Sequence, residues 1–485
     1  MSPSKRVLVR LAAAASVLAL GACTTVGPNF KRPEPPAGGS ANYAMAGDPV
    51  APGVTLSPDA RSAGPWWEAF GSPELNAVVR QALADSPTLA EATATLQRAQ
   101  AQAAAAAGAQ LPQVDANASA QRERINIAAF GFPGFANPTL SLYSIGASVN
   151  YDLDLFGGRR RQTEEAHARA EAEGHRADAA YLSLSGNVAI QAMRIASLRA
   201  QLGAVQAVID DDQKVIDLVR RAERAGGEAP SAIVSGQAQL AEDEALLPPL
   251  QRDLEAARHQ LALLVGKSPA DWTAPDFDLA KMTAPASIPI SLPSTLVRSR
   301  PDILAAEAEL HQTTAAIGVA IADMYPDVRL APAYTQTTLN TESLFNYSAS
   351  GWNIGPTVTL PIFHGGALKA NRRAAEADAR ASMARYQQTV LRAFVQVSDV
   401  LSALGSDQAS IEALTRAVTA SEHRARNAQT AYSLGGGTLL EVTDAQRQLS
   451  RSRRALVQMQ GQMYVDLVQL YAVTATDWRP AAKST

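Results

Sequence analysis

Hydrophobic and polar residues alternate along four short stretches of the chain, which lie between long alanine-rich segments. The alternation is unbroken in 145–155 and clear in 114–121 and 352–362, and it is weaker in 328–334. A period of two predicts strands with one apolar and one polar face. We therefore expect strands at about 112–126, 138–156, 326–340 and 350–363.

Two very long helices are predicted after the second and fourth strands. No proline occurs in 158–225 or in 365–434, and at 1.5 Å per residue each helix reaches ~100 Å. Glycines then interrupt the helical pattern at Gly226, Gly227, Gly435 and Gly436. Return helices are expected at about 230–265 and 438–471, which gives two antiparallel hairpins, 158–265 and 365–471.

The same order of elements occurs twice, which predicts two internal structural repeats. Pro112 and Pro326 precede the first strand of each copy and lie 214 positions apart. The first repeat spans 63–266 and the second 294–478, with a proline-rich linker at 267–293 and a C-terminal tail at 479–485. Four strands cannot close a barrel, so a protomer must borrow strands from other copies, and a cyclic trimer supplies twelve.

The first 22 residues have the features of a secretory signal peptide. A basic start precedes the apolar run 11–20, and small residues lead to Cys23, the single cysteine of the chain. We predict that Cys23 is lipidated and that 23–62, rich in proline, glycine and serine, is a tether. Thr24 follows, instead of the aspartate that often retains lipoproteins in the inner membrane, which favours the outer membrane.

Composition argues against several functional classes. The net charge of −3 gives no sign of a nucleic-acid partner. Gly266-Lys267-Ser268 resembles the end of a phosphate loop, but Leu261 stands where that motif needs a glycine. The six histidines are scattered, with no metal-ligand spacing. No catalytic residue, metal site or cofactor is predicted beyond the lipid on Cys23, and the chain does not have the features of an enzyme.

Several motifs resemble the TolC-like outer-membrane factor family, in its OprM/NodT-type branch of efflux lipoproteins. They extend over nearly the whole mature chain in the order typical of the family. They are Cys23–Pro33 with Gly27-Pro28-Asn29-Phe30, Trp66-Trp67-Glu68-Ala69-Phe70, Ser299-Arg300-Pro301-Asp302-Ile303, Tyr432-Ser433-Leu434-Gly435 and Leu440–Arg447. At 474–478 the chain departs from relatives, which usually carry a glycine run before the tryptophan.

The resemblance implies a mixed α+β membrane protein. Relatives are homotrimers whose twelve-stranded β-barrel crosses the outer membrane and continues as a long α-helical barrel through the periplasm, with the linker in an equatorial region. They are passive conduits for small molecules, including multiple drugs. A periplasmic adaptor and an inner-membrane pump, here expected to be of the RND type, supply the cargo. The lipid-anchored protein would thus contact outer-membrane lipid and extend into the periplasm.

The resemblance also implies a periplasmic gate formed by Leu440, Asp444 and Arg447. Aligning Leu449 with Leu240 places these residues opposite Ser231, Ser235 and Ala238, so the repeat is broken there. They lie on one helical face, and three copies of Asp444 would form a carboxylate ring bridged by Arg447 or a cation. The alternative is a surface ion pair worth under about 1 kcal/mol. The turns at Gly226–Gly227 and Gly435–Gly436, the ends furthest from the membrane, are expected to contact the adaptor.

Two other functions remain open from the sequence. One is an outer-membrane duct for protein or oligosaccharide secretion, although such ducts often lack a lipid anchor. The other is a structural lipoprotein with a coiled-coil stalk, which should keep regular heptads over many turns. The irregular, alanine-rich helices favour the efflux conduit.

Overall fold

The computed structural model describes residues 25–34, 43, 56–57, 65–126, 129, 131, 134, 136–285, 288–289 and 293–475. The chain divides into two compact units. The strand unit consists of 1–33, 95–174 and 305–386, and the helical unit consists of 34–94, 175–304 and 387–485. The signal peptide and Cys23 lie outside the described residues, as does the tail at 479–485.

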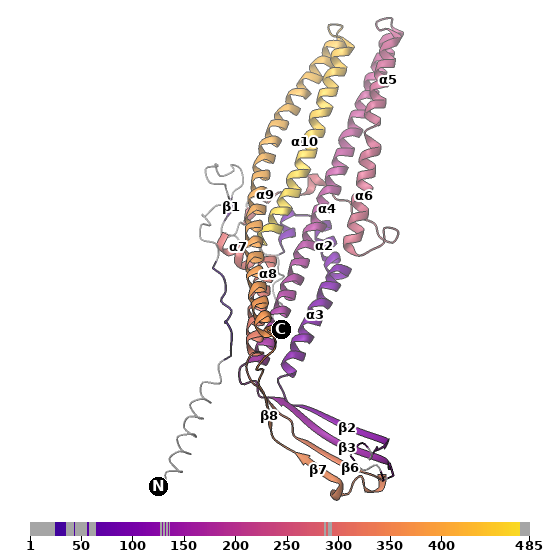
Figure 1. Ribbon diagram of the computed structural model, residues 1–485. Coiled ribbons are helices and arrows are strands. Elements are labelled where there is room, and N and C mark those ends of the chain that lie inside the picture. Colours follow the sequence, from indigo (N-terminus) through magenta and orange to yellow (C-terminus); the bar gives the residue numbers. More distant parts are fainter. Residues whose placement is uncertain are drawn as a thin grey trace. The chain divides into compact units, whose positions relative to one another are not determined.

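The strand unit contains one antiparallel sheet built from both halves of the chain. Its central strand, β3 (Thr139–Asp152), pairs with β2 (Gln113–Arg124) on one side and with β5 (Asp327–Leu330) and β6 (Ala333–Thr338) on the other. Beyond these, β7 (Ser350–Asn353) pairs with β6 and β8 (Pro356–Thr359) pairs with β5. The sheet thus has four strand positions, in the order β2, β3, β5/β6, β7/β8. Figure 1 labels β2, β3, β6 and β7 within it.

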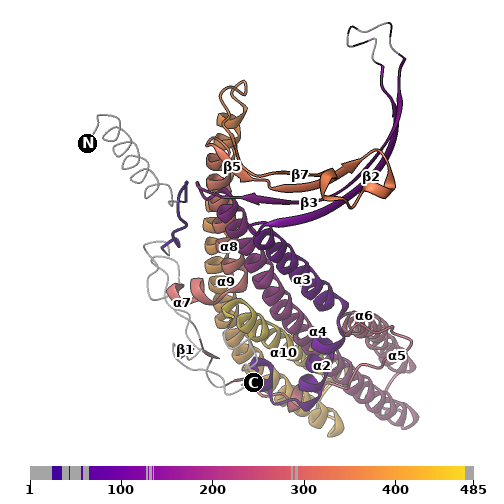
Figure 2. The ribbon, with the colours of Figure 1, turned by 90° about the horizontal axis from the view of Figure 1, so that it is seen from below.

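The register of the sheet sorts the alternating residues onto two faces. Val114 lies opposite Val149 and Ala118 opposite Ile145, while Tyr334 lies between Ala147 and Trp352. The intervening Asn117 lies opposite Gly146, on the polar face. One face is therefore largely apolar and the other largely polar, as the alternation predicts. Figure 2 shows the strands curving together.

The prediction of unbroken strands in the second half was wrong. The stretch 326–340 forms two short strands, β5 and β6, separated at Ala331–Pro332, and 350–363 forms β7 and β8, separated before Pro356. Proline has no N–H to donate to a ladder, so a strand bends or ends where it occurs. The carbonyl of Pro332 still accepts a hydrogen bond from Val149 N–H at 2.9 Å, which keeps the pieces in one sheet.

Strand β3 ends earlier than the alternation predicts because Asp154 starts the next helix. Asp154 has a positive φ of 42°. Its carboxylate accepts the backbone N–H groups of Arg159 at 2.8 Å and Arg160 at 3.0 Å, near the first turn of α4 (Gly158–Arg224). Such a carboxylate satisfies N–H groups that a helix start leaves unpaired. The alternation up to Leu155 is therefore not all strand.

The long helices agree with the predicted hairpins. Helices α4 and α9 (Ala367–Ser433) each have 67 residues, and α10 (Leu439–Thr474) returns from α9 without a break. The first return helix was predicted as one helix, but it is two, α5 (Pro230–Glu244) and α6 (Leu247–Val265). Pro248 and Pro249 lie in the first turn of α6. In one continuous helix each proline would lack a backbone hydrogen bond and clash with the preceding turn, so the helix breaks before them. No helix among the described residues is both long and apolar enough to cross a membrane.

Shorter helices and strands complete the fold. The helices that precede the strands are α2 (Pro73–Asp85), α3 (Pro87–Gly108), α7 (Pro293–Ser299) and α8 (Pro301–Ala322). Short 3-10 helices are η1 (Trp66–Phe70), η3 (Leu279–Lys281), η4 (Thr341–Ser343) and η5 (Tyr347–Ala349), and β1 (Leu56–Ser57) pairs in parallel with β4 (Ile288–Pro289).

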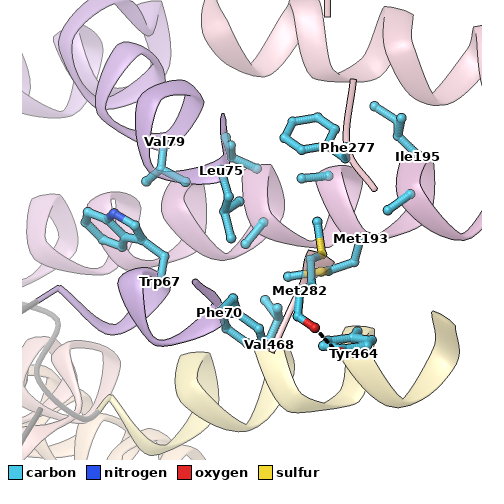
Figure 3. Close-up of a cluster of buried hydrophobic side chains, with 14 of the residues drawn as sticks. Trp67, Phe70, Leu75, Val79, Met193, Ile195, Phe277, Met282, Tyr464 and Val468 are labelled. Carbon is cyan, nitrogen blue, oxygen red and sulfur yellow. Dashed lines mark hydrogen bonds between the residues drawn. The ribbon is translucent and has the colours of Figure 1, made fainter. Parts of the chain in front are cut away.

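The core of the helical unit is built around the Trp-Trp-Glu-Ala-Phe motif. Trp66 and Phe70 are fully buried and stack on or against Tyr471 of α10. Burying one such side chain contributes about 1.5–3 kcal/mol. Figure 3 shows Phe70, Leu75, Met193 and Val468 converging from η1, α2, α4 and α10.

The predicted linker contributes to this core. Phe277 is 1% exposed and Met282 is 6% exposed, and the Met282 carbonyl accepts a hydrogen bond from the Tyr464 hydroxyl at 2.8 Å (Figure 3). Residues 267–293 are therefore not a simple connection between halves. The prolines of this stretch led to the prediction of a linker, so the burial of its apolar residues was not predicted.

The Arg-Pro-Asp motif at the start of α8 holds helices together. Arg300 is 8% exposed and donates to the Asp302 carboxylate at 2.7 Å, to the Val473 carbonyl at 2.8 Å and to Gln396 at 2.8 Å. A buried guanidinium needs such partners for its donors. The motif thus fixes α8 to α9 and to the end of α10.

Candidate functional site: the ends of the two hairpins

Both hairpin turns use the same backbone device. Gly226 and Gly435 have φ of 78° and 76°, in the left-handed region that favours glycine. The next glycine in each turn, Gly227 or Gly436, donates its N–H to the carbonyl of Ala222 or Ala431 at 2.9 Å. These bonds satisfy carbonyls that the helix end leaves unpaired, in the manner of a Schellman cap. The predicted turn residues therefore end both long helices.

The two turns pack against each other within the helical unit. Val215, Val219 and Val442 form a buried cluster joined by Leu439. The Tyr432 hydroxyl donates to the Glu228 carboxylate at 3.0 Å, from the end of α9 to the first turn. Burial, with the neighbouring Glu228 carboxylate, raises the pKa of Tyr432 to about 12. The ends of the hairpins are thus one structure with contacts between both halves of the chain.

The three predicted gate residues lie on the first three turns of α10. Leu440 is 67% exposed, and the Asp444 side chain is 49% exposed. Arg447 Nη1 lies 3.8 Å from Asp444 Oδ1, which is too long for a hydrogen bond. The structure therefore brings the triplet together on one face, with a weak Asp444–Arg447 contact.

The close partner of Arg447 is a residue that the sequence analysis missed. Arg447 Nε donates to the Gln239 side-chain oxygen on α5, and Gln239 is 9% exposed. The Gln239 amide in turn donates to Asp243 Oδ2 at 2.6 Å. This hydrogen bond from Arg447 to Gln239, which we call the latch, joins α10 of the second hairpin to α5 of the first. A glutamine has no distinctive sequence signal, although a repeat alignment carried beyond the turn would have drawn attention to its neighbours.

The N-terminal motif forms a second built site, in the strand unit. Residues 25–34 are extended but held in place, so the tether does not begin there. Arg161 is 3% exposed and donates to the carbonyl of Val26 at 3.1 Å and to the Asn29 side chain at 2.7 Å. Phe30 stacks on His311 with centroids 4.5 Å apart. Asn29 and Phe30 are thus motif residues with structural partners.

Close approach explains the glycine of the same motif. Gly27 has a φ of 90°, and a Cβ there would lie 2.5 Å from the Cα of Gly318 on α8. A side chain at position 27 would therefore collide with helix backbone. Cys23 lies four residues before Gly27 in the chain, outside the described residues.

The described residues include no group of three or more His, Cys, Asp or Glu side chains arranged to hold a metal ion. A cavity of about 310 Å³ lies where β3, β5 and β8 meet α4 and α8. Its carboxylates include Asp152, which is paired with Arg159 at 3.0 Å, and Asp327, which is paired with Arg329 at 2.6 Å. The structure thus offers no nucleophile or cofactor site there that we can assign.

A family model described as outer membrane efflux protein matches the chain twice, over residues 78–267 and 292–476. The chain belongs to this family. The two matches correspond closely to the two predicted repeats.

Individual relatives match over most of their length. Nodulation protein T of Rhizobium leguminosarum bv. viciae is 27% identical over 463 residues, covering 95% of this chain and 92% of that protein. The pyoverdine export outer membrane protein OpmQ of Pseudomonas aeruginosa is 27% identical over 432 residues, covering 87% and 89%.

Solved structures of outer-membrane channels have the same fold. The OprN channel is 29% identical with a TM-score of 0.85, covering 94% of this chain and all of that one. The open state of the Neisseria gonorrhoeae MtrE outer membrane channel is 25% identical with a TM-score of 0.82, covering 95% and 100%.

Proposed function

We propose that three copies of this chain form a passive conduit through the outer membrane for the efflux of small molecules. The observation that carries the proposal is a sheet of four strand positions whose outer strands, β2 on one side and β7/β8 on the other, have no further partner among the described residues. All twelve residues of β2 are exposed. Unpaired edges of this length are a liability unless another chain covers them.

Pairing β2 of one copy with β7/β8 of the next would cover both edges. Three copies would then supply twelve strands in a closed barrel, with the apolar face toward lipid. The duct needs no energy source of its own. An inner-membrane pump, joined to the duct by a periplasmic adaptor, would supply and select the cargo. A relative, the solvent efflux pump outer membrane protein SrpC of Pseudomonas putida, is named as part of a pump.

Thiol cross-linking tests the pairing of copies. Cys23 is the only natural cysteine, so introduced thiols report on their own contacts. Each variant carries two introduced cysteines, one in β2 at Asn117 or Ser119 and one in β7/β8 at Asn353 or Thr357. These variants should give covalent dimers and trimers on denaturing gels. Native mass spectrometry in detergent should give three copies of the parent. A folded, stable single copy would contradict the proposal.

Within this conduit we assign the gate to the hairpin ends. Leu440 would form an apolar ring and Asp444 an anionic ring, because three copies around an axis repeat each residue three times. Arg447, bound to Gln239, would hold α10 of the second hairpin to α5 of the first.

The turns are assigned to contact with the adaptor. Gly227 and Gly436 suit cysteine probes, because a Cβ at either has only one neighbour, a carbonyl oxygen at 3.5 Å or 3.9 Å. Gly226 and Gly435 do not, because their positive φ strains any other residue. Gly227→Cys and Gly436→Cys should trap the adaptor in cells, whereas Ser402→Cys, mid-way along α9, should not. Equal trapping at all three positions would contradict the assignment.

Lipid on Cys23 is the remaining part of the proposal. The arm that follows is fixed to α4 and α8 through Arg161 and Phe30, so a lipid four residues earlier than Gly27 would stay near this part of the strand unit. Mass spectrometry of the purified amino-terminal peptide should find the lipid on Cys23. Cys23→Ser should weaken membrane anchoring while the three-copy mass is retained. An unmodified Cys23 would overturn this part alone.

A further inference from the structure

A pair of aspartates is buried between the two helices of the first hairpin. Asp212 on α4 and Asp243 on α5 are each 8% exposed, and Asp243 is close enough to contribute to the raised pKa of Asp212. Two neighbouring buried carboxylates repel each other when both are ionised, so the pair binds a proton more readily than either group would alone. Oδ2 of Asp212 has no hydrogen-bond partner among the described residues.

The pair is connected to the latch through one side chain. Gln239 donates to Asp243 Oδ2 at 2.6 Å and accepts from Arg447 Nε. The charged groups that act on Asp212 come from three helices: Asp211 on α4, Asp243 on α5 and Arg447 on α10. Burial, followed by the neighbouring Asp243, raises the pKa of Asp212 to about 7, while Arg447 opposes that rise.

In the second hairpin, uncharged residues occupy the two positions that correspond to Asp212 and Asp243. An offset of 209 residues superposes the two turns, Gly226 on Gly435, and places Asp212 and Asp243 opposite Ser421 and Ser452. Those serines are buried and form a hydrogen bond of 3.5 Å with each other. Gln448, opposite Gln239, likewise donates to Ser452 at 3.5 Å. The fold therefore packs without carboxyl groups here, and the acid pair of the first hairpin calls for a functional explanation.

We propose that Asp212 and Asp243 form a proton-binding site whose occupancy sets how firmly Arg447 holds α10 to the first hairpin, so that the gate is tighter when the proton has left. The proton comes from solvent and returns to it, and the charge of the pair changes from −1 to −2 on release. Arg447 stabilises the ionised pair, and by linkage the ionised pair stabilises Arg447 in its place. Acidification weakens that hold and favours the open duct. The gating half of this inference rests on the proposed function.

The matched variant imports the residues of the second hairpin, Asp212→Ser with Asp243→Ser. Infrared difference spectra between about pH 6 and about pH 8 should show loss of a protonated-carboxyl band in the parent with a midpoint near 7, as the raised pKa requires. The component with a midpoint near 7 should be absent from the double variant, which keeps only the component of Asp407, whose pKa burial raises to about 6. A parent without the component near 7, or a double variant that keeps that component, would overturn the proton site.

Arg447→Ala tests the coupling without any need for conduction. Because Arg447 favours the ionised pair, its removal should move the infrared midpoint to higher pH. An unchanged midpoint would mean that occupancy of the site and the latch are independent, and the proposal would fail.

Bilayer recordings then test the gate. Conductance of the parent should rise as pH falls through about 7, and this step should disappear in the double serine variant and in Arg447→Ala. A second pair of buried aspartates, Asp407 on α9 and Asp466 on α10, offers a control, since each is 7% exposed. The same offset places them opposite Leu198 and Ala257, and Asp407→Leu with Asp466→Ala should keep the step. A step that survives in the double serine variant overturns the coupling to the gate. A parent that never conducts, yet shows the infrared shift in Arg447→Ala, refutes the conduit and not the proton site.

Discussion

The two hairpins share the length of their first helix and the geometry of their turn, and they differ in the side chains at their ends. Helices α4 and α9 have the same length of 67 residues, and both end at a glycine of nearly identical φ. The second hairpin carries the exposed Leu440 and Asp444, whereas the first has Ser231 and Ser235 at those positions. The first hairpin instead supplies Gln239, which receives Arg447. The gate we assign is therefore made from both hairpins, with the projecting residues on one and the receiving residues on the other.

The return helices of the two hairpins also differ, both in how they begin and in whether they are continuous. The second begins with a capping box, in which Thr438 and Glu441 satisfy each other's backbone N–H groups, and it continues without a break. The first begins at Ala229 with no side-chain cap and breaks before Pro248. A straight, capped helix holds its first turns in a fixed orientation. We infer that the second hairpin is built to present residues at a defined position and the first to adapt to it.

The largest effect on conduction is expected from Arg447→Ala, which removes the hydrogen bond from α10 to Gln239 on α5. A hydrogen bond from a charged group contributes about 1.5–3 kcal/mol, and partial exposure of Arg447 lowers this to about 1 kcal/mol. The ratio of open to closed channels should therefore rise about fivefold. Single-channel recordings measure it, and Arg451→Ala, at an exposed position of the same helix, should have no effect. Equal behaviour of the two variants would contradict the assigned latch.

The next effect concerns ion selectivity. Asp444→Ala should reduce the preference for cations and raise conductance, because three copies of Asp444 would otherwise form an anionic ring. Ser235→Ala changes the corresponding position of the first hairpin and should leave both unchanged. Reversal potentials in a salt gradient give the answer. If the two variants are alike, the broken repeat has no role in selectivity.

The caps give a reciprocal pair of predictions, of similar free energy but confined to local hydrogen exchange. Thr438→Ala should destabilise the first turn of α10 by about 1 kcal/mol, which makes its amides exchange about fivefold faster. Ala229→Thr should slow exchange at the start of α5, because a threonine at that position can accept from an orphan N–H. Hydrogen exchange resolved by peptide measures both. No change in either variant would remove the capping difference from the comparison.

The smallest effect is expected from Tyr432→Phe. This change removes the hydroxyl that donates to Glu228 while it keeps the ring in the valine cluster. The loss should be about 0.5–1 kcal/mol, since Glu228 can be hydrated once released. Exchange should speed up in the Ala225–Ala229 turn and not at Arg300 near the core. A uniform change across both regions would show that Tyr432 acts through overall stability.

Much of this architecture could be predicted from sequence because it follows from local rules. Alternation predicted the four strand positions, and glycine pairs predicted both hairpin turns. Local rules also account for the errors. Asp154 continues the alternation but caps a helix instead, and Pro332 and Pro248 divide elements that hydrophobic periodicity alone shows as continuous.

The contacts of the gate were harder to foresee. Asp444 and Arg447 are three residues apart, so their pairing was a natural expectation, yet the close partner, Gln239, lies 208 residues away in the chain. Nothing in a single sequence specifies that separation. The offset of 209 residues between the repeats places Asp444 opposite Ser235. The same offset places Asp212 and Asp243 opposite Ser421 and Ser452, which shows a second position where the two halves differ chemically.

The central claim is that several copies enclose a conduit that is narrow at the hairpin end. Neutral polymers of graded size, added to one side of a bilayer at a time, test it directly through their effect on single-channel conductance. We predict that larger polymers enter from the strand side than from the hairpin side, and that Leu440→Ala reduces this difference. The same size limit from both sides, unchanged in Leu440→Ala, would contradict the account.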